Sequence, residues 1–553
     1  MHRLGPCSDS AASFASKLLR RPRRAGMDPI AVQCRLQENS VVHRRRLADG
    51  LSSHASRHAA RRRHRGQTDR CSSAHFHGGG LKGHVRGNEA ILRHLSMDST
   101  MARHRFGISP DFLIIAAAIL GSSAVMLGES VATLALPSIG RTLQVPFSSL
   151  QWVVDGYNLT LASCILFGGS LGDLMGLRRV YLWSAGAFLA LSLICALAWS
   201  GLTLILFRSL LGVAGALLTP VSLAVLNAQL PKYMRSRAIA YWTAATSIVL
   251  AIGPLLGGYL VDLFSWRAIF LFNVPLVFIA MVIGYAALDK APTRRGIGID
   301  WSGAILAFLF LGGITFGLIE GPANGWPATA IAAIVAGVVC FGAFVWWQRH
   351  ASHPLVDLAL FRNRNFSATN AATLLLYAAF GGFGFLFSYF LQTVAGFSAT
   401  AAGAAFLPVS VMLGLGSGQV GKYSSRLGPR WFMGVGPLFC AAGMLALVSL
   451  GRDTTYLAGV LPGVMLFGVG LTLTVAPLTA TALNSAPDKK SGVASAINNG
   501  LASAGPLIVI ALLGLGGLEH AYVLGVWICV VLAAIAGLIS LVFVRGAPVG
   551  SPT

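Results

Sequence analysis

The sequence contains few charged residues for its length. Asp, Glu, Lys and Arg together make up 11% of the 553 residues, whereas hydrophobic residues make up 55%. A soluble globular domain carries about 25% charged residues. This shortage argues against a soluble globular protein and favours a chain that lies largely within a membrane.

The residue patterns of metal, nucleotide and hydrolytic chemistry are also missing. The eight cysteines are scattered, and no pair has the spacing of a metal site. There is no glycine-rich phosphate loop followed by Lys and Ser or Thr, which argues against direct use of ATP. There is no Gly-x-Ser-x-Gly motif and no histidine pair at ligand spacing. We therefore predict that the protein is not an enzyme and binds no metal or organic cofactor.

The first fifth of the chain differs in composition from the rest. Residues 1–110 hold 21 of the 42 Lys and Arg residues and carry a formal charge of +14, against +9 for residues 111–553. They show no hydrophobic period and no apolar segment of a signal peptide. We predict that residues 1–105 form a disordered basic tail, or are translated from a start codon upstream of a true start at Met97 or Met101. A tail that binds nucleic acid or anionic lipid, or serves as a transit peptide, is a weaker alternative, and no nucleic-acid partner is expected.

Apolar runs of about 20 residues recur after residue 110, and each is long enough to cross a bilayer. We predict fourteen spans, at residues 112–136, 149–170, 179–198, 202–228, 238–260, 268–288, 301–320, 329–348, 368–390, 399–420, 432–450, 456–480, 492–514 and 522–544. Seventeen of the 21 Lys and Arg residues after residue 110 fall in loops on one predicted side, and three fall on the other. Since positive charge favours the cytoplasmic side, this alternation predicts that both termini are cytoplasmic.

A weak internal repeat follows the second and tenth predicted spans. Residues 169–178 and 421–430 both have glycine at the first and eighth positions and arginine at the tenth. Two related halves around a central site are a common plan of transporters. The predicted organisation is a basic tail, an N-terminal six-helix half, an inserted helix pair with its loops, a C-terminal six-helix half and a short tail, at residues 1–105, 106–290, 291–366, 367–545 and 546–553 respectively.

The fifth span contains an unusual run, Gly253-Pro254-Leu255-Leu256-Gly257-Gly258. Proline removes a backbone donor, and glycine costs about 1 kcal/mol relative to alanine inside a helix. Such residues suit a membrane helix that bends or that packs very closely against a neighbour. We predict that Gly253, Pro254, Gly257 and Gly258 form a bend or tight-packing element that limits leak between the halves. Simple packing is the alternative.

Several motifs resemble those of the major facilitator superfamily, and specifically of its fourteen-helix drug:proton antiporters. Residues 169–179 resemble the loop between helices two and three, and residues 253–258 resemble the antiporter motif of helix five. The other matching segments are Leu136-Pro137, Arg208 with Gly212, Gly215 and Ala216, and the stretch from Pro354 to Phe361. The resemblance covers about residues 110–545. It implies an all-α polytopic membrane protein with the major facilitator fold, in which fourteen transmembrane helices form two six-helix halves and an inserted pair.

Glu129 is the one acid well inside a predicted span. A carboxylate is costly there when it is charged, so it is suited to bind and release a proton during transport. The family usually has an aspartate at the position of Gly128, one residue earlier and about 100° away around the helix. We predict that Glu129 takes part in proton coupling. The alternative is a carboxylate at the outer end of its helix that faces water or has a fixed partner.

Arg208 is the one basic residue inside a predicted span. Because an unpaired arginine is costly in the membrane, we expect a carboxylate partner such as Glu129 or Asp155. The resemblance to the family's fourth-helix arginine implies a role in proton coupling, in which protonation of the partner releases the arginine. The alternative is a structural ion pair, or a set of hydrogen bonds to carbonyl groups, that holds the helices together.

A group of residues at the cytoplasmic end of the second span resembles the family's inner gate. It consists of Gly169, Asp173, Gly176, Arg178 and Arg179. Glycine permits close helix approach, and aspartate can cap a helix or pair across the bundle. The resemblance implies a latch that closes the inner gate. The alternative is a determinant of membrane topology combined with a helix cap.

Asp155, Tyr157 and Trp242 are candidates for the lining of a substrate cavity. Asp155 could equally be the solvated end of a span, and Trp242 could belong to the aromatic belt of the membrane. Asp300 and Glu320, which flank the seventh span, are predicted to be its solvated ends.

Together these features predict a proton-coupled secondary transporter in the inner (plasma) membrane of a bacterium. Alternating access would rock the two halves around a central cavity, and inward proton flow through Glu129 and Arg208 would drive export of apolar or cationic drug-like compounds. The partners would be the small-molecule substrate, protons and the lipid bilayer, and a monomer is expected. A proton-coupled symporter or an exporter of an endogenous metabolite is the alternative, and a membrane enzyme or interaction scaffold is a third class.

Overall fold

The computed structural model describes residues 109–289, 298, 300–487, 490–513 and 518–545, and the structural statements below refer to these residues. The predicted tails at 1–105 and 546–553 lie outside them, and the predicted domain boundaries remain a prediction. The described segments are α-helices, short 3₁₀ and π turns and their connections, and they include no β-strand. The predicted all-α class is therefore confirmed.

The described residues before the inserted pair form seven helices. These are α4 (Pro110–Ser130), α5 (Ala132–Leu143), α6 (Phe147–Met175), α7 (Leu177–Ala196), α8 (Gly201–Gln229), α9 (Lys232–Leu263) and α10 (Arg267–Ala287). The hydroxyl of Ser109 caps α4 by accepting a hydrogen bond from Phe112 N, and Pro110 occupies the first helical position, where no donor is needed. The first predicted span is divided in two, since the helix is interrupted at Val131.

The inserted pair consists of α11 (Trp301–Ala323) and α12 (Ala328–His350). The 3₁₀ turn η2 (Leu358–Arg362) then leads to the C-terminal helices. These are α13 (Arg364–Thr393), α14 (Ala399–Ala404), α15 (Leu407–Leu427), α16 (Pro429–Ala446), α17 (Leu461–Asn484) with the preceding π turn η3 (Tyr456–Val460), α18 (Ser491–Leu512) and α19 (Leu518–Phe543). The tenth predicted span is also divided, around Ala405 and Phe406.

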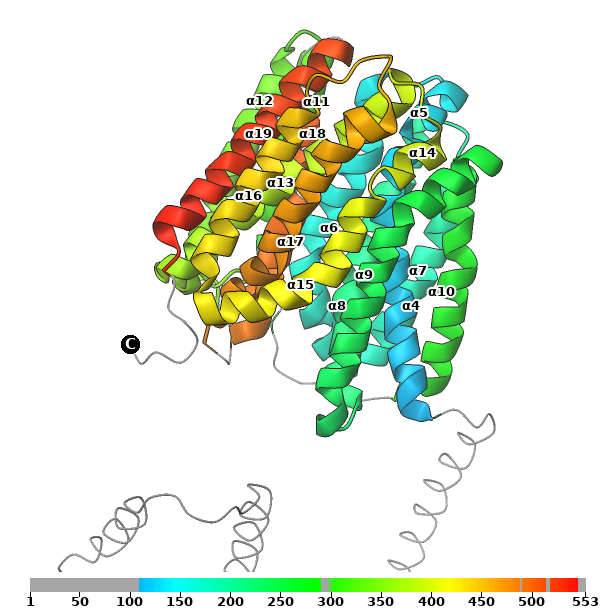
Figure 1. Cartoon of the computed structure of the whole chain (residues 1–553). Coiled ribbons are helices and arrows are strands. Elements are labelled where there is room, and N and C mark those ends of the chain that lie inside the picture. Colours follow the sequence, from blue (N-terminus) through cyan, green and yellow to red (C-terminus); the bar gives the residue numbers. More distant parts are fainter. Residues whose placement is uncertain (1–108, 290–297, 299, 488–489, 514–517, 546–553) are drawn as a thin grey trace, which may run out of the picture. The chain divides into compact units, whose positions relative to one another are not determined.

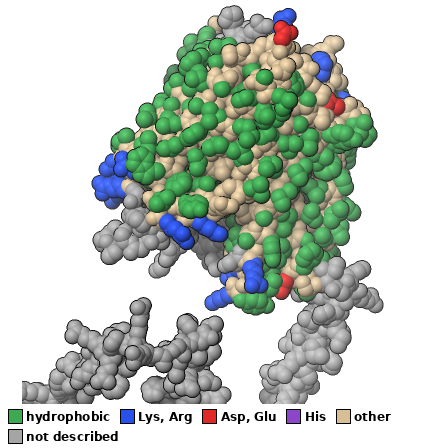
Figure 2. Space-filling view, viewed as in Figure 1, with side chains coloured by type: hydrophobic (Ala, Val, Ile, Leu, Met, Phe, Trp, Pro, Cys, Tyr) green, Lys and Arg blue, Asp and Glu red, His purple; other side chains and the backbone are tan. Residues whose placement is uncertain are grey.

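Twelve helical stretches in the described part of the chain are long and apolar enough to cross a membrane. The predicted second and eleventh spans, which correspond to α6 and α16, are not among them, so the count of fourteen remains a prediction. α6 buries an unusual set of polar side chains, namely Gln151, Asp155, Asn158, Thr160 and Ser163. Figure 2 shows hydrophobic side chains over much of one face, with Lys and Arg gathered towards the lower end of the view.

The helices pack in two groups, α4 to α10 and α13 to α19 (Figure 1). In the first group α6 and α7 pack on α8, and α4 packs on α8, α9 and α10; in the second, α13 packs on α18 and α19, and α16 packs on α17 and α19. The groups meet where α6 lies against α18, and where α9 lies against α14 and α15. We call these contacts the α6–α18 seam and the α9–α14 seam. α11 contacts both α6 and α18, whereas α12 packs mainly on α11.

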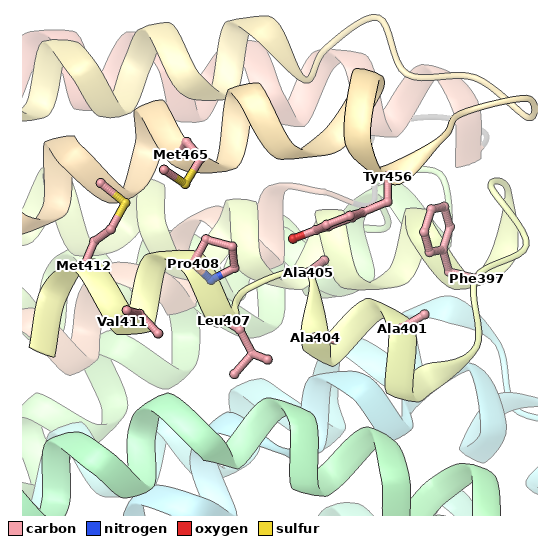
Figure 3. A pocket seen from close by; sticks show the side chains of 10 residues that line it. All are labelled: Phe397, Ala401, Ala404, Ala405, Leu407, Pro408, Val411, Met412, Tyr456 and Met465. Atoms are coloured by element: carbon pink, nitrogen blue, oxygen red, sulfur yellow. The ribbon is translucent and has the colours of Figure 1, made fainter.

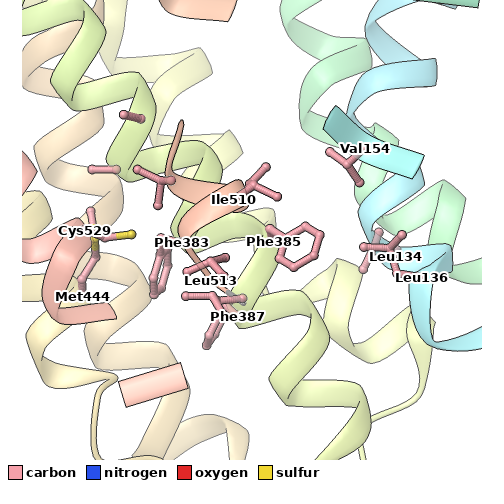
Figure 4. Close-up of a cluster of buried hydrophobic side chains, with 14 of the residues drawn as sticks. Leu134, Leu136, Val154, Phe383, Phe385, Phe387, Met444, Ile510, Leu513 and Cys529 are labelled. Carbon is pink, nitrogen blue, oxygen red and sulfur yellow. The ribbon is translucent and has the colours of Figure 1, made fainter. Parts of the chain in front are cut away.

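A cluster of buried hydrophobic side chains, part of which lies at one end of the molecule, joins the two groups (Figure 4). Its members include Leu134 and Leu136 of α5, Val154 of α6, Phe383, Phe385 and Phe387 of α13, and Ile510 and Leu513 of α18. The ring centre of Phe147, at the start of α6, lies 5.8 Å from that of Phe385 and 5.4 Å from that of Tyr389. In a membrane, close packing of this kind holds helices together. The cluster closes the end that the charge pattern predicts to be outside the cell.

Candidate functional site

Arg208 of α8 is buried where four helices meet. Its side chain is 1% exposed; Nε donates to the Val153 carbonyl of α6 at 2.6 Å, and Nη2 donates to the Gly128 carbonyl of α4 at 3.1 Å. The guanidinium carbon lies 4.9 Å from the ring centre of Tyr157 and 5.8 Å from that of Phe270, within the range at which a cation is attracted to an aromatic face. Arg208 thus ties α8 to α4, α6 and α10.

The carboxylate partner that we expected for Arg208 is not found among the described residues. Neither Glu129 nor Asp155 forms an ion pair with it, and its Nη1 has no hydrogen-bond partner there. The guanidinium instead donates to two backbone carbonyls, which is the structural alternative considered above. Membrane arginines are often accommodated by carbonyl groups in this way.

Glu129 follows directly after the carbonyl that accepts from Arg208. Its side chain is partly exposed, lies next to the interruption of α4 and forms no hydrogen bond with the described residues. Gly128 is buried, and a Cβ at that position would lie 3.5 Å from Phe188 Cζ and 3.8 Å from Asn273 Nδ2. Gly128 therefore faces α7 and α10, and the Glu129 side chain leaves α4 in a direction about 100° away. In this conformation Glu129 and Arg208 interact electrostatically but form no ion pair.

Asp155 is fully buried, so the alternative that it is the solvated end of a span is wrong. Neither carboxylate oxygen has a partner among the residues that the structure describes. Gln151, four residues earlier, donates to the Ile510 carbonyl of α18 at 2.5 Å, and Leu159, four residues later, packs in a cluster with Leu507 of α18. Because residues four apart share a helix face, Asp155 lies on the side of α6 that meets α18. A buried carboxylate without a partner marks a functional residue in a membrane protein by default.

Tyr157 and Trp242 do not join Asp155 in one cavity within the described structure. Tyr157 is fully buried, donates to the Val125 carbonyl of α4 at 3.3 Å and supports the Arg208 guanidinium with its ring. Trp242 of α9 is partly buried and donates from Nε1 to Ser122 Oγ of α4 at 3.0 Å. Their assignment to a substrate cavity remains a prediction.

The predicted inner gate is only partly described. Gly169 and Asp173 lie on α6, but the side chain of Asp173 lies outside the described residues. Gly176 has φ 91°, a conformation that favours glycine, and it separates α6 from α7. Arg178 donates to the Tyr285 carbonyl within the same helix group at 2.7 Å, and Arg179 is exposed. The latch therefore remains a prediction.

The second copy of the repeat has the same local geometry as the first. Gly428, the counterpart of Gly176, has φ 88° and separates α15 from α16. Two glycines at equivalent positions with nearly equal positive φ support the internal repeat seen in the sequence.

The glycine–proline run of α9 is a packing surface inside one continuous helix. A Cβ on Gly257 would overlap the side chain of Val131, at the interruption between α4 and α5. A Cβ on Gly258 would overlap the Ala399 backbone of α14. In the other direction, a Cβ on Gly403 of α14 would overlap the Pro254 carbonyl of α9. The tight-packing interpretation is therefore supported, and it extends across the α9–α14 seam.

Asp262 adds a polar contact to the same seam, for which we predicted no role. Its carboxylate accepts hydrogen bonds from Ala399 N at 3.1 Å, Thr400 N at 2.7 Å and Thr400 Oγ1 at 2.6 Å. Asp262 comes one helical turn after Gly258, so the glycine surface and the carboxylate lie on neighbouring turns of α9. The four-residue spacing between Gly258 and Asp262 is the feature of the sequence that could have indicated this contact.

The prediction that Asp300 and Glu320 are solvated ends is wrong for Asp300 and incomplete for Glu320. Asp300 is 7% exposed and accepts from Trp347 Nε1 at 2.7 Å and Gln348 Nε2 at 2.8 Å. Glu320 accepts from Trp152 Nε1 of α6 at 2.8 Å. Both carboxylates are bound by side chains distant in the sequence, which local composition does not indicate.

An apolar cavity of about 700 Å³ lies apart from Arg208, between α14, α15, η3 and α17 (Figure 3). It is lined by Phe397, Ala401, Ala404, Ala405, Leu407, Pro408, Val411, Met412, Tyr456 and Met465. None of these side chains carries a charge, so the cavity suits an apolar group. No residue of the Arg208 site contributes to it.

Comparison with known proteins identifies the family. Residues 118–510 match the sequence profile of the Major Facilitator Superfamily. The chain belongs to this superfamily. Among its relatives, multidrug resistance protein Stp of Mycobacterium tuberculosis (strain ATCC 25618 / H37Rv) is 34% identical over 71% of this chain and 74% of the relative. Methylenomycin A resistance protein of Bacillus subtilis (strain 168) is 33% identical over 71% of this chain and 85% of the relative.

A third relative and two solved structures agree with this major facilitator assignment. Tetracenomycin C resistance and export protein of Streptomyces glaucescens is 31% identical over 73% of this chain and 75% of the relative. A peptide transporter POT in complex with sulfate has a TM-score of 0.60 at 13% identity and covers 79% of this chain and 94% of its own. A D-xylose-proton symporter has a TM-score of 0.56 at 14% identity and covers 79% and 99% respectively. The solved structures show the fold alone, and they confirm the predicted major facilitator fold.

Proposed function

We propose that this major facilitator protein exports apolar or cationic drug-like compounds across a bacterial inner membrane, driven by inward proton flow. The relatives named for multidrug, methylenomycin A and tetracenomycin C resistance support export. The exposed Lys and Arg residues at one end of the bundle support an orientation with both termini in the cytoplasm. The transporter acts as a monomer on a small-molecule substrate and protons.

The observation that carries the proton-coupling part is the position of Arg208. Its Nη2 binds the carbonyl directly before Glu129, while its Nε binds the Val153 carbonyl of α6. A charged Glu129 would compete with the Val153 carbonyl for the guanidinium, and a protonated Glu129 would not. Gain and loss of one proton would therefore change how strongly α8 is tied to α6.

Closure at one end supports alternating access. The hydrogen bonds between the two described helix groups are those of Gln151 with α18 and of Asp262 with α14. Both lie at the end where Phe147 packs against Phe385 and Tyr389. A transporter that rocks between two states must form such contacts in one state and break them in the other. In this conformation the outer end is closed, and the latch proposed for Asp173, Arg178 and Arg179 would close the opposite end in the other state.

The apolar cavity of Figure 3 supports an apolar substrate. Met412, Met465 and the ring of Tyr456 provide adaptable, polarisable surfaces that accept ligands of different shape. The cavity offers no buried polar set that would select a sugar or a peptide. This favours the export of drug-like compounds over the uptake of a hydrophilic nutrient.

Ethidium efflux from an efflux-deficient bacterial host tests the proposal. Cells that express the wild type should lose ethidium when energised and retain it when the proton gradient is collapsed. Glu129→Gln should abolish energised efflux while it preserves exchange down a concentration gradient. Equal energised efflux by Glu129→Gln would refute the role of Glu129. Unchanged accumulation of ethidium and of every other drug tested would refute drug export.

A further inference from the structure

The inserted helices α11 and α12 form a tightly joined hairpin. A Cβ on Gly313 would lie 2.7 Å from the Ala333 carbonyl, and a Cβ on Gly317 would lie 2.6 Å from the Ala330 carbonyl. Real Cβ atoms do not approach backbone oxygens this closely, so the two helices are in contact along their backbones. The hairpin can therefore move as one unit.

Asp300 fastens the hairpin at the ends of its two helices. The carboxylate caps α11 by accepting from Gly303 N at 2.8 Å, and it also accepts from Trp347 and Gln348 near the end of α12. Leu355 N, in the segment that follows α12, donates to it at 3.3 Å. Four donors on one buried carboxylate fix the hairpin at this end.

The hairpin covers the α6–α18 seam through α11 alone. Leu311 of α11 packs against a cluster formed by Leu159 and Ala162 of α6 and by Ala504 and Leu507 of α18. One helix of the hairpin is thus in contact with both helix groups, and α12 forms the outer layer. A rigid unit that bridges two groups restrains their separation at that seam.

Towards its other end, α11 is attached to α6 by a side-chain hydrogen bond and a ring contact, both of which involve Trp152. Trp152 Nε1 donates to Glu320 Oε1 at 2.8 Å, and the ring of Trp152 lies 6.2 Å from that of Phe316 between centroids. The second oxygen of Glu320 accepts from Asn324 Nδ2 at 2.8 Å, which holds the carboxylate in place. The pair therefore connects the hairpin to the first turns of α6.

Three consecutive residues of α6 bind three different helices. Gln151 donates to the Ile510 carbonyl of α18, Trp152 donates to Glu320 of α11, and the Val153 carbonyl accepts from Arg208 of α8. A shift of α6 at Trp152 must therefore change the geometry at both neighbouring contacts.

We propose that the inserted pair braces α6, and that Glu320 and Trp152 are positioning residues for proton coupling. Glu320 holds Trp152 so that the adjacent Val153 carbonyl stays aimed at Arg208 while α11 keeps the α6–α18 seam closed. The inference rests on the proposed function insofar as it assigns Arg208 to proton coupling. The closure of the seam is a separate physical claim that does not depend on any substrate.

The seam is tested by alkylation of single cysteines in full-length, otherwise cysteine-free protein in native membranes. One reporter is Leu507→Cys in the α6–α18 seam, and the control reporter is Ala402→Cys of α14, which is also fully buried. Glu320→Ala should raise the rate of N-ethylmaleimide labelling at position 507 by about fivefold, as expected for one lost side-chain hydrogen bond, and should leave position 402 unchanged. Glu320→Gln retains an acceptor oxygen and should label like the wild type.

Trp152→Phe supplies the second half of the test. It removes the N–H donor and retains an aromatic ring, so it should match Glu320→Ala, and the double variant should show no further increase because both changes remove the same bond. Wild-type labelling at position 507 in both single variants would overturn the brace. Equal increases at positions 507 and 402 would also overturn it, because they indicate general loosening.

Transport separates the brace from the proposed function. In energised ethidium efflux, Glu320→Ala should lower the maximal rate without a change in KM, and Glu320→Gln should restore it. A change in KM alone would overturn the positioning role. If labelling responds as expected but Arg208→Lys and Glu129→Gln leave proton-driven efflux unchanged, then the proposed coupling site is wrong and the brace stands.

Discussion

The two seams between the helix groups are built in different ways. At the α6–α18 seam, Gln151 bonds to a helix carbonyl, apolar side chains interdigitate, and α11 lies over the contact. At the α9–α14 seam, glycine surfaces bring backbones together and the exposed Asp262 accepts from α14. α5 contacts both α9 and α14 at this second seam, as α11 contacts both α6 and α18 at the first. The first seam therefore depends on interdigitated side chains and a buried amide, whereas the second depends on close backbones and a carboxylate that water can reach.

The largest expected effect comes from filling the glycine surface of the α9–α14 seam. Gly258→Val would place side-chain atoms within the Ala399 backbone, and overpacking of this kind costs about 1–3 kcal/mol. We expect a lower Tm in detergent and loss of ethidium efflux, because the outer end can no longer close. Gly414→Val in α15 is the matched control, since a Cβ there meets nothing within 4 Å. If both variants lost similar amounts of thermal stability and efflux, then the losses would not arise from overpacking at the α9–α14 seam.

A second change removes the polar contact of the same seam and leaves its shape intact. Asp262→Ala deletes the acceptor for Ala399 N, Thr400 N and the Thr400 hydroxyl, and the contact is worth about 1 kcal/mol because it is exposed to water. We expect about fivefold faster alkylation of Ala402→Cys and no change at Leu507→Cys, the reverse of the pattern for Glu320→Ala.

Thr400→Val provides a graded control for Asp262→Ala. It removes the hydroxyl donor but retains the two backbone donors, so its effect on the labelling of Ala402→Cys should be smaller. If Asp262→Ala raised the alkylation rate of Leu507→Cys as much as that of Ala402→Cys, this would contradict the view that the two seams are controlled independently.

Gln151→Leu tests the polar contact of the covered seam. Its amide donates to the Ile510 carbonyl, and interhelical hydrogen bonds in membranes average about 0.6 kcal/mol, which corresponds to roughly a threefold change in an equilibrium. Because α11 covers this seam, labelling of Leu507→Cys should rise by no more than that factor. A larger increase than for Glu320→Ala would show that Gln151, and not the inserted pair, holds the seam closed.

Sequence patterns predicted the elements better than their contacts. Length and apolarity located helices at every predicted span, and the Gly253 to Gly258 run indicated close packing, because both properties are local. The interruption at Val131 was not predicted, since no glycine or proline marks it. The partners of Glu320 and Asp300 lie 168 and 47 residues away, and no local pattern encodes such distances.

The arginine site shows the same limit at the scale of one residue. Composition identified Arg208 and Glu129 as the ionisable residues deepest in their spans, but the rotation of α4 decides which group faces the guanidinium. The Gly128 carbonyl, close to the helix interruption at Val131, binds Arg208, and the Glu129 carboxylate forms no hydrogen bond with it. A one-residue offset of about 100° is decisive for a hydrogen bond and invisible to hydrophobic patterning.

The smallest expected effect concerns a contact that crosses neither seam. Lys490, before α18, forms a hydrogen-bonded ion pair with Asp357, before η2, and this bond lowers the pKa of Asp357 below its usual value. A carboxyl with a lowered pKa in the folded state stabilises the protein above its unfolded pKa, and this contribution is lost as the pH falls through the folded value. Because both side chains are partly exposed, the contribution is at most about 1 kcal/mol. Asp357→Asn should therefore slightly lower the Tm at pH 7, this difference should shrink as the pH falls below the usual pKa of an aspartate, and labelling at positions 402 and 507 should not change. A change at either reporter would show that the Asp357–Lys490 pair also controls a seam.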